Sequence, residues 1–259
     1  MKKNSHFAGI DVGASATKAV IIDDQARIAG SSVVRSGFDF EEAANRVLGE
    51  ALSAAGLEPM SLDRLFSTGY GRANVPSAHG TRTEIACHGR AVHHFFPGRE
   101  ITIVDIGGQD NKVIHIGPDG RRSAFKMNRK CAAGTGAFVE EIAARIQLPI
   151  ADLDRLARQS TNEVAIGSFC TVFSGSEILA LVRKGVKTPD IVKGVFRSVL
   201  KRIIEMDPLE GEVVLTGGVA AHNPIVVEML SEMLGRAVKV PPGPQLAGAL
   251  GAALLARDN

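Results

Sequence analysis

Residues 7–21 read Phe7-Ala-Gly-Ile-Asp-Val-Gly-Ala-Ser-Ala-Thr-Lys-Ala-Val-Ile, and residues 101–114 read Ile101-Thr-Ile-Val-Asp-Ile-Gly-Gly-Gln-Asp-Asn-Lys-Val-Ile. The two stretches match in one ungapped register at four pairs of positions, each 94 residues apart: Asp11 with Asp105, Gly13 with Gly107, Lys18 with Lys112 and Val20 with Ile114. Each stretch has a β-branched apolar run that ends in Asp, a glycine-containing turn and a second apolar run. This pattern predicts a β-hairpin in each copy.

Each predicted hairpin continues into a further polar turn, at residues 23–25 and at residues 118–120, so a third antiparallel strand is expected in both copies. An Asp at the end of a strand, followed by a glycine turn, suits a particular chemistry. Exposed backbone N–H groups in such turns hold phosphate oxygens, and carboxylates hold Mg2+ directly or through its waters. The repeat therefore favours a phosphate-binding site over two ordinary hairpins.

Outward from the repeat, the composition limits the alternatives. The chain has 259 residues, 45% of them hydrophobic and 22% charged, which predicts one large or two medium domains with a substantial core. The formal net charge is only +2, and neither sign gathers into a block, so a dedicated nucleic-acid or membrane-surface protein is disfavoured. The sequence contains neither a signal peptide nor an apolar run of about 20 residues. We expect a cytoplasmic protein with reduced thiols, because its three cysteines cannot form a fully paired disulfide framework.

A third motif follows much later, where residues 212–220 read Glu-Val-Val-Leu-Thr-Gly-Gly-Val-Ala. This is a predicted buried strand that runs into a glycine pair, and such glycines let a ligand lie against bare backbone. In order, the three motifs resemble the phosphate-1, phosphate-2 and adenosine motifs of the superfamily that includes actin, hexokinase, acetate kinase and the heat-shock ATPases. No Walker A pattern occurs, so a P-loop protein is excluded.

That resemblance implies an α/β protein with two similar domains of the actin/hexokinase-like ATPase fold. Each domain would hold a mixed five-stranded sheet with helices, and ATP with Mg2+ would lie in the cleft between them. The expected limits are residues 1–98 with 244–259 for the first domain and residues 99–243 for the second.

Two of the cysteines, Cys131 and Cys170, precede stretches with helical character, the second starting at about Ser176. Helix N-termini stabilise thiolates and bound anionic clusters. Small buried residues, a catalytic nucleophile and a zinc site all remain open at this stage, although no histidine partner and no four-ligand set is evident within one chain. Two chains would supply four thiolates, which is enough for a cluster on a dimer axis.

Several segments together are similar to the activators, or component A, of 2-hydroxyacyl-CoA dehydratases. They are residues 130–138 (Lys-Cys-Ala-Ala-Gly-Thr-Gly-Ala-Phe), 170–173 (Cys-Thr-Val-Phe), 105–110 and 215–220, with further likeness at 68–72, 84–88 and 248–253. The separation of 39 residues between the two cysteines also fits that family. Activators share their ATPase family with the ATP-binding subunits of benzoyl-CoA reductases.

The resemblance implies an oxygen-sensitive homodimeric ATPase with one 4Fe-4S cluster between its subunits, held by Cys131 and Cys170 of each. Reduced ferredoxin or flavodoxin would charge the cluster. ATP binding and hydrolysis would then drive one low-potential electron to the dehydratase, component D, where a ketyl radical forms on the 2-hydroxyacyl-CoA.

The same resemblance implies roles for individual residues. Asp11 and Asp105 would hold Mg2+ and its water shell, and Gln109 would orient the attacking water. The expected nucleotide-binding residues lie in the glycine-containing turns: Gly13, Ala14, Ser15, Lys18, Gly107 and Gly108 for phosphates, Gly217, Gly218 and Val219 for adenosine, and Gly134, Thr135 and Gly136 as a link between the nucleotide edge and the cluster helix. For Lys18, a solvated strand lysine is an almost equal alternative.

The third cysteine, Cys87, is assigned to packing. The nearby histidines (His88, His93 and His94) lack the i, i+4 spacing of a helical zinc site.

Two other functions stay open. The ATP-binding subunit of a class I benzoyl-CoA reductase shares the motifs and both cluster cysteines, whereas a small-molecule kinase of the same fold would not need the cysteines.

Overall fold

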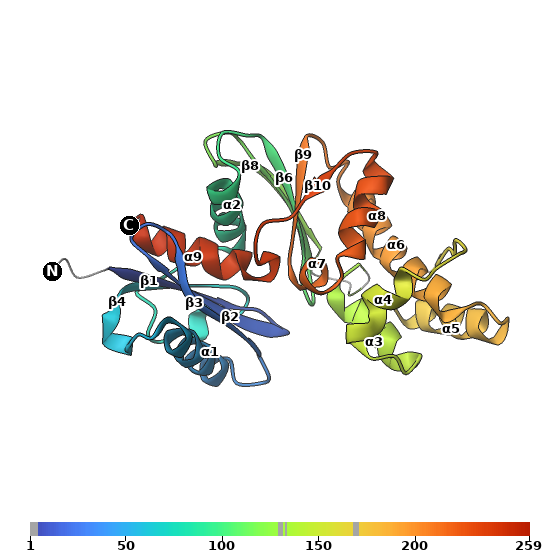
Figure 1. The fold of residues 1–259 in the computed structure, drawn as a ribbon, viewed down its shortest axis with the longest axis horizontal. Coiled ribbons are helices and arrows are strands. Elements are labelled where there is room, and N and C mark those ends of the chain that lie inside the picture. The colour runs from blue at the N-terminus through green and yellow to red at the C-terminus, as the bar shows by residue number, and fades with distance from the viewer. Residues whose placement is uncertain (1–4, 129–131, 133, 168–170) are drawn as a thin grey trace. The chain divides into compact units, whose positions relative to one another are not determined.

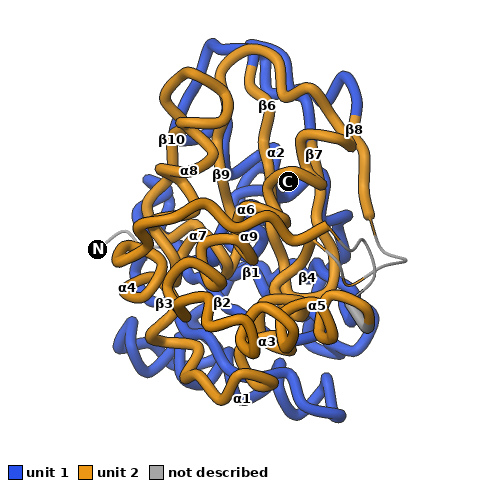
Figure 2. Tube along the Cα trace, turned by 90° about the vertical axis from the view of Figure 1, so that its right-hand side faces the viewer, with its two compact units in different colours: residues 1–100, 114–124, 245–259 blue, residues 101–113, 125–244 orange. Residues whose placement is uncertain are grey.

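The computed structural model describes residues 5–128, 132, 134–167 and 171–259. The chain divides into two compact units, coloured separately in Figure 2. Unit 1 contains residues 1–100, 114–124 and 245–259, and unit 2 contains residues 101–113 and 125–244. The domain limits expected from the sequence stay a prediction.

Unit 1 is built on a five-stranded mixed sheet whose strands follow the order β3-β2-β1-β4-β5. The strands are β1 (His6–Val12), β2 (Ala16–Asp23), β3 (Ile28–Arg35), β4 (Leu62–Thr68) and β5 (Gly80–Thr81). β1 pairs antiparallel with β2 and parallel with β4. The first repeat copy is thus the predicted hairpin, and β3 is the expected third strand.

The sheet of unit 1 is covered on both faces, by α1 (Phe40–Ala55) on one and α9 (Ala247–Arg257) on the other (Figure 1). Side chains alternate along β2: Ala19 and Ile21 join the core beneath α1, whereas Val20 and Ile22 join the core beneath α9. Because both faces are covered, this period of two explains why residues 19–22 of β2 form a continuous apolar run. α2 (Glu84–Phe95) packs against α9.

Unit 2 is built around the second repeat copy. Its sheet follows the order β10-β9-β6-β7-β8, with β6 (Ile101–Ile106), β7 (Asn111–Ile116), β8 (Arg122–Asn128), β9 (Glu212–Thr216) and β10 (Val238–Lys239). Residues 114–124 of β7 and β8 are counted with unit 1. β6 pairs parallel with β9, as β1 does with β4. The prediction of two similar mixed five-stranded sheets is confirmed.

The helices of unit 2 surround one large apolar core. They are α3 (Gly136–Arg145), α4 (Leu153–Ala157), α5 (Thr171–Arg183), α6 (Thr188–Met206), α7 (Gly218–His222) and α8 (Ile225–Leu234). Short 3-10 turns lie at residues 59–61, 72–74, 150–152 and 244–246. Within the described ranges, no helix is long and apolar enough to cross a membrane.

The start of α5 corrects one prediction, because the helix begins at Thr171 and not at about Ser176. Its first turns contain Ser174 and Gly175, which are weak helix formers, and that misled the sequence-based boundary. In the fold, the Arg145 guanidinium of α3 occupies the space that a side chain on residue 175 would need, since a Cβ there would lie 2.6 Å from a guanidinium nitrogen. Packing against Arg145 thus accounts for a small residue at position 175 within the helix.

Candidate nucleotide site

Asp11 is the last residue but one of strand β1 in unit 1 and is 7% exposed. It lies opposite Lys18 in the β1–β2 register, and Lys18 Nζ donates to Asp11 Oδ2 at 2.9 Å. The lysine side chain is only 16% exposed, so it is not the solvated strand lysine considered as an alternative. The turn between the strands closes through the Gly13 N–H, which donates to the Ala16 carbonyl.

Ser36, the residue after β3, forms hydrogen bonds to the turn between β1 and β2. Its buried hydroxyl donates to the Gly13 carbonyl at 2.6 Å and lies 2.9 Å from the Thr17 hydroxyl. The Ser36 N–H donates to the Ser15 carbonyl. The first predicted phosphate turn is therefore held by a neighbouring strand as well as by its own hairpin.

Asp105 occupies the matching position in unit 2 and is 4% exposed. Thr216 Oγ1 donates to Asp105 Oδ1 at 2.9 Å, and Lys112 Nζ lies 3.3 Å from Oδ2 and 2.7 Å from Asp110 Oδ1. Lys112 is 3% exposed. A buried ammonium between two carboxylates fixes both of their positions, because moving either one would leave charge unpaired.

The glycines that follow Cys131 are hydrogen-bonded to the second phosphate turn. The Gly136 N–H donates to the Gly107 carbonyl at 2.9 Å, the Ala137 N–H to the Gly108 carbonyl, and Asn111 Nδ2 to the Gly134 carbonyl at 2.9 Å. Gly134 adopts φ +90, a conformation that favours glycine. These contacts connect the turn at residues 107–108 with the first turn of α3, and the linking role expected for this segment stays a prediction.

The glycine pair after β9 is similarly constrained. Gly217 has φ +98, its N–H donates to the Pro244 carbonyl, and a Cβ there would lie 2.3 Å from the Ile106 carbonyl oxygen. Gly218 then begins α7, in which Val219 is 7% exposed. The expected adenosine-binding segment thus packs directly against the strand that carries Asp105.

The two units share a second correspondence that the sequence repeat did not reveal. In the parallel strand pairs, Thr68 lies beside Asp11 and Thr216 lies beside Asp105. The next residue is a glycine in each case, and Gly69 has φ +94. A Cβ on Gly69 would lie 2.4 Å from the carbonyl oxygen of Val12, the residue after Asp11. A Cβ on Gly217 would be similarly close to the carbonyl oxygen of Ile106, the residue after Asp105.

The turns fit a phosphate-bearing ligand. The backbone N–H groups of Ala14, Ser15 and Gly108 donate to no other residue in the described parts of the chain, so they are open to an anion. Gln109, the expected water-orienting residue, is exposed on the same turn as Gly108. A lysine lies against one oxygen of each aspartate, and Thr216 donates to the other oxygen of Asp105, so these carboxylates suit contact with Mg2+ through its waters better than direct coordination.

The predicted cluster ligands, Cys131 and Cys170, lie outside the described residues. Among the described residues, no group of three or more His, Cys, Asp or Glu side chains is arranged to hold a metal ion. Cys87 is completely buried in α2, and burial raises the pKa of its thiol to about 12 although the Thr68 hydroxyl acts in the opposite direction. Such a thiol suits packing, as expected.

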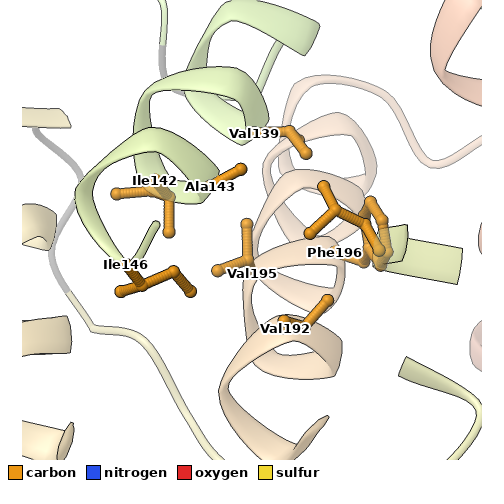
Figure 3. A pocket seen from close by; sticks show the side chains of 8 residues that line it. Val139, Ile142, Ala143, Ile146, Val192, Val195 and Phe196 are labelled. Carbon is orange, nitrogen blue, oxygen red and sulfur yellow. The ribbon is translucent and has the colours of Figure 1, made fainter. Parts of the chain in front are cut away.

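The pocket in Figure 3 is not part of this site. It lies between α3 and α6 and is lined by eight apolar residues, among them Val139, Ile142, Val195 and Phe196. Its volume of about 10 Å3 is enough for one water molecule at most. Neither its chemistry nor its size suits a nucleotide, so it belongs to the core of unit 2.

Sequence reasoning missed several residues that hold the site together: Lys112 and Asp110 at Asp105, Ser36 at the first turn, Asn111 at Gly134, and Gly69 beside Asp11. Lys112 carried a usable signal, because it repeats Lys18 in the same register, and Asp110 and Gly69 lie in segments that carried the family resemblance. Ser36 and Asn111 contact residues at the site that lie 23 positions away in the sequence, which a local pattern does not encode.

Two hairpins with glycine turns and buried aspartates, on matching mixed sheets, define an ATPase of the actin/hexokinase-like fold. The chain belongs to the BadF/BadG/BcrA/BcrD ATPase family, whose model matches residues 8–256.

Full-length relatives carry names that agree with this family. The chain is 40% identical over 254 residues to the 2-hydroxyisocaproyl-CoA dehydratase activator of Clostridioides difficile, covering 97% of this chain and 94% of the relative. It is 40% identical over 252 residues to the (R)-2-hydroxyglutaryl-CoA dehydratase activating ATPase of Acidaminococcus fermentans, covering 96% and 95%. A more distant relative, 27% identical over 95% of this chain and 91% of its own length, is a benzoyl-CoA reductase subunit of Thauera aromatica.

Solved structures of dehydratase activators also resemble this chain. The crystal structure of the Acidaminococcus fermentans dehydratase component A superimposes with a TM-score of 0.92 at 39% identity, covering 98% of both chains. The Clostridium difficile activator with bound ADPNP superimposes with a TM-score of 0.91 at 38% identity, covering 98% of this chain and 94% of that one. A glucokinase of the ROK family from Streptomyces griseus, at 14% identity and a TM-score of 0.60, shares only the fold.

Proposed function

We propose that this ATPase is the activator of a 2-hydroxyacyl-CoA dehydratase and passes one low-potential electron to it at the expense of ATP hydrolysis. The observation that carries the proposal is 40% identity over nearly the full length to proteins named as such activators. The lower identity to a benzoyl-CoA reductase subunit makes that alternative the weaker one. A small-molecule kinase has support only from the fold.

The nucleotide chemistry is assigned to the two hairpins. ATP with Mg2+ would bind with its phosphates on the open N–H groups of Ala14, Ser15 and Gly108. Nucleotide binding is supported by the Clostridium difficile activator, whose solved structure contains bound ADPNP. Asp11 and Asp105 would hold the waters of Mg2+, and Gln109 would orient the water that attacks the terminal phosphate. The remaining roles are as expected from the sequence, with Gly217, Gly218 and Val219 against adenosine.

The electron-transfer role is assigned to Cys131 and Cys170 of two subunits. A 4Fe-4S cluster held by these four thiolates in a homodimer would supply the low-potential electron, taken from reduced ferredoxin or flavodoxin. The hydrogen bonds of Gly134 and Gly136 offer a path by which nucleotide state could reach the cysteine-bearing segment. For such control, ATP and ADP must differ in affinity for two conformations of the protein.

Anaerobic purification of the chain alone tests this proposal. A homodimer with about four irons that activates a 2-hydroxyacyl-CoA dehydratase, with ATP and a reduced donor, supports it. Cys131→Ser and Cys170→Ser should lose the iron, while the matched control Cys87→Ala should keep it. An apo monomer that binds iron only with a dissimilar partner chain would favour the reductase. Full ATP hydrolysis and activation by Asp105→Asn would show that the Mg2+ assignment is wrong.

A further inference from the structure

The Asp11 carboxylate is enclosed by two positions that have no side chain. A Cβ on Gly248, in the first turn of α9, would lie 2.9 Å from Asp11 Oδ2, 3.1 Å from Cγ and 3.4 Å from Cβ. A Cβ on Gly69, in the turn after β4, would meet the Val12 carbonyl group first and would also lie 2.6 Å from Asp11 Oδ1. Both glycines belong to unit 1, together with Asp11 and Lys18. Each oxygen of the carboxylate thus lies against bare backbone.

We propose that Gly248 and Gly69 are positioning residues for Asp11, and that the absence of a side chain at both sets the orientation of the carboxylate that serves Mg-nucleotide. The inference rests on the role proposed for Asp11 above. The proposal gives the C-terminal helix a part in the nucleotide site, because Gly248 belongs to α9. This helix is far from Asp11 in the sequence.

Helix formation does not explain the glycine at position 248. Its backbone is not in the left-handed region, and alanine is the better helix former. The three atoms nearest to a Cβ at this position would all belong to the Asp11 side chain. Gly251, one turn further on, differs: its Cβ would lie 1.8 Å from the backbone carbonyl oxygen of Cys87 in α2. In α9, Gly248 therefore makes room for the Asp11 side chain, whereas Gly251 makes room for the backbone of Cys87.

The physical consequence of a methyl group at position 248 follows from these distances. The contact of 2.9 Å is one that real Cβ atoms essentially never show, and the contact of 3.1 Å is tighter than most, so the Asp11 carboxylate must rotate or shift. Rotation would break the 2.9 Å ion pair of Oδ2 with Lys18 and would change the direction offered to the metal waters. Asp11→Ala removes Oδ2 and Cγ, and of the three nearest atoms it leaves the Asp11 Cβ at 3.4 Å, which is an ordinary contact distance.

A double-mutant cycle measured by thermal unfolding, without nucleotide, tests the contact itself. We expect Gly248→Ala to lower the Tm when Asp11 is present and to leave it unchanged or raise it in the Asp11→Ala background. Gly251→Ala should lower the Tm equally in both backgrounds, because its contact is with Cys87. Gly49→Ala, on the open surface of α1, should not lower the Tm or change ATP hydrolysis. An equal Tm loss for Gly248→Ala in both backgrounds would overturn the inference.

Binding experiments test whether Gly248 positions Asp11 for Mg-nucleotide. Titration with Mn2+ followed by EPR, and calorimetry with Mg-ADP, should show about tenfold or greater weakening for Gly248→Ala, the size usual for residues that orient metal ligands. Unchanged affinities for Gly248→Ala alongside weakened ones for Asp11→Ala would refute positioning. Unchanged affinities of Asp11→Ala for Mn2+ and Mg-ADP would instead refute the role proposed for Asp11. The double-mutant cycle would still test the contact between Gly248 and Asp11. Gly69→Ala should weaken binding too, although its positive φ adds strain that Asp11→Ala does not relieve.

Discussion

Nζ of Lys112 lies 3.3 Å from Oδ2 of Asp105, and both side chains are almost completely buried. The equivalent pair in unit 1, Lys18 with Asp11, is closer at 2.9 Å but more accessible, with side chains 16% and 10% exposed. The repeat thus places a lysine beside each aspartate, and the two pairs differ in how far water screens them. This difference predicts unequal effects of the same substitution.

Lys112→Met should destabilise the protein by about 3–5 kcal/mol, because it leaves the buried Asp105 charged and without its cation and also removes the ion pair of the partly exposed Asp110. Lys18→Met should cost less, because the Asp11 pair is better hydrated. Urea unfolding followed by circular dichroism gives both values. Equal losses for the two variants would contradict the argument from burial.

Ser36→Ala should loosen the first phosphate turn. The variant removes the hydroxyl that donates to the Gly13 carbonyl and meets Thr17 inside the protein, at a cost of about 1–3 kcal/mol. We also expect weaker binding of Mg-ATP, which calorimetry measures. Ser32→Ala, on β3, is the control, because its hydroxyl bonds only to Glu50 at the surface. Similar losses for both variants would show that the bracing contact is unimportant.

Asp190 provides a pH-dependent contribution to stability. Hydrogen bonds, above all from the Asn162 backbone N–H, lower the pKa of Asp190 from 3.8 to about 2. Because the folded pKa is the lower one, this stabilisation is present above about pH 4 and is lost as the pH falls from there towards 2. Asp190→Asn should therefore lower the Tm most at neutral pH and progressively less towards pH 3. A Tm difference that is constant across this range would refute the assignment.

Cys87 should not react with thiol reagents in the native protein. It is completely buried and its pKa is raised to about 12, so little thiolate forms at pH 8 and reagents cannot reach it. In a Cys131→Ser, Cys170→Ser variant, the Ellman reagent should detect one thiol per chain in denaturant and none on the same timescale in native buffer. Rapid native labelling would mean that α2 opens readily or that the burial is wrong.

Much of the architecture could be predicted from the sequence because it is encoded locally. The strand periodicity, the Asp-x-Gly turns and the 94-residue repeat identified both hairpins, and the glycine pair after β9 identified a third motif. The expected start of α5 was wrong because Ser174 and Gly175, which are weak helix formers, lie inside the helix and not before it. The site roles of Asp11, Asp105 and their turns remain predictions that the proposed experiments test.

By itself, the sequence determined the repeated hairpin, the family and the residue types available for phosphate and Mg2+. Only the tertiary structure decided which backbone positions surround those residues. Thr68 and Thr216 come beside the two aspartates through parallel pairing, and Gly248 reaches Asp11 because α9 packs on the sheet that contains β1. The physical reason is that a hairpin forms from neighbouring residues, whereas these contacts depend on crossover connections and close packing between segments far apart in the chain.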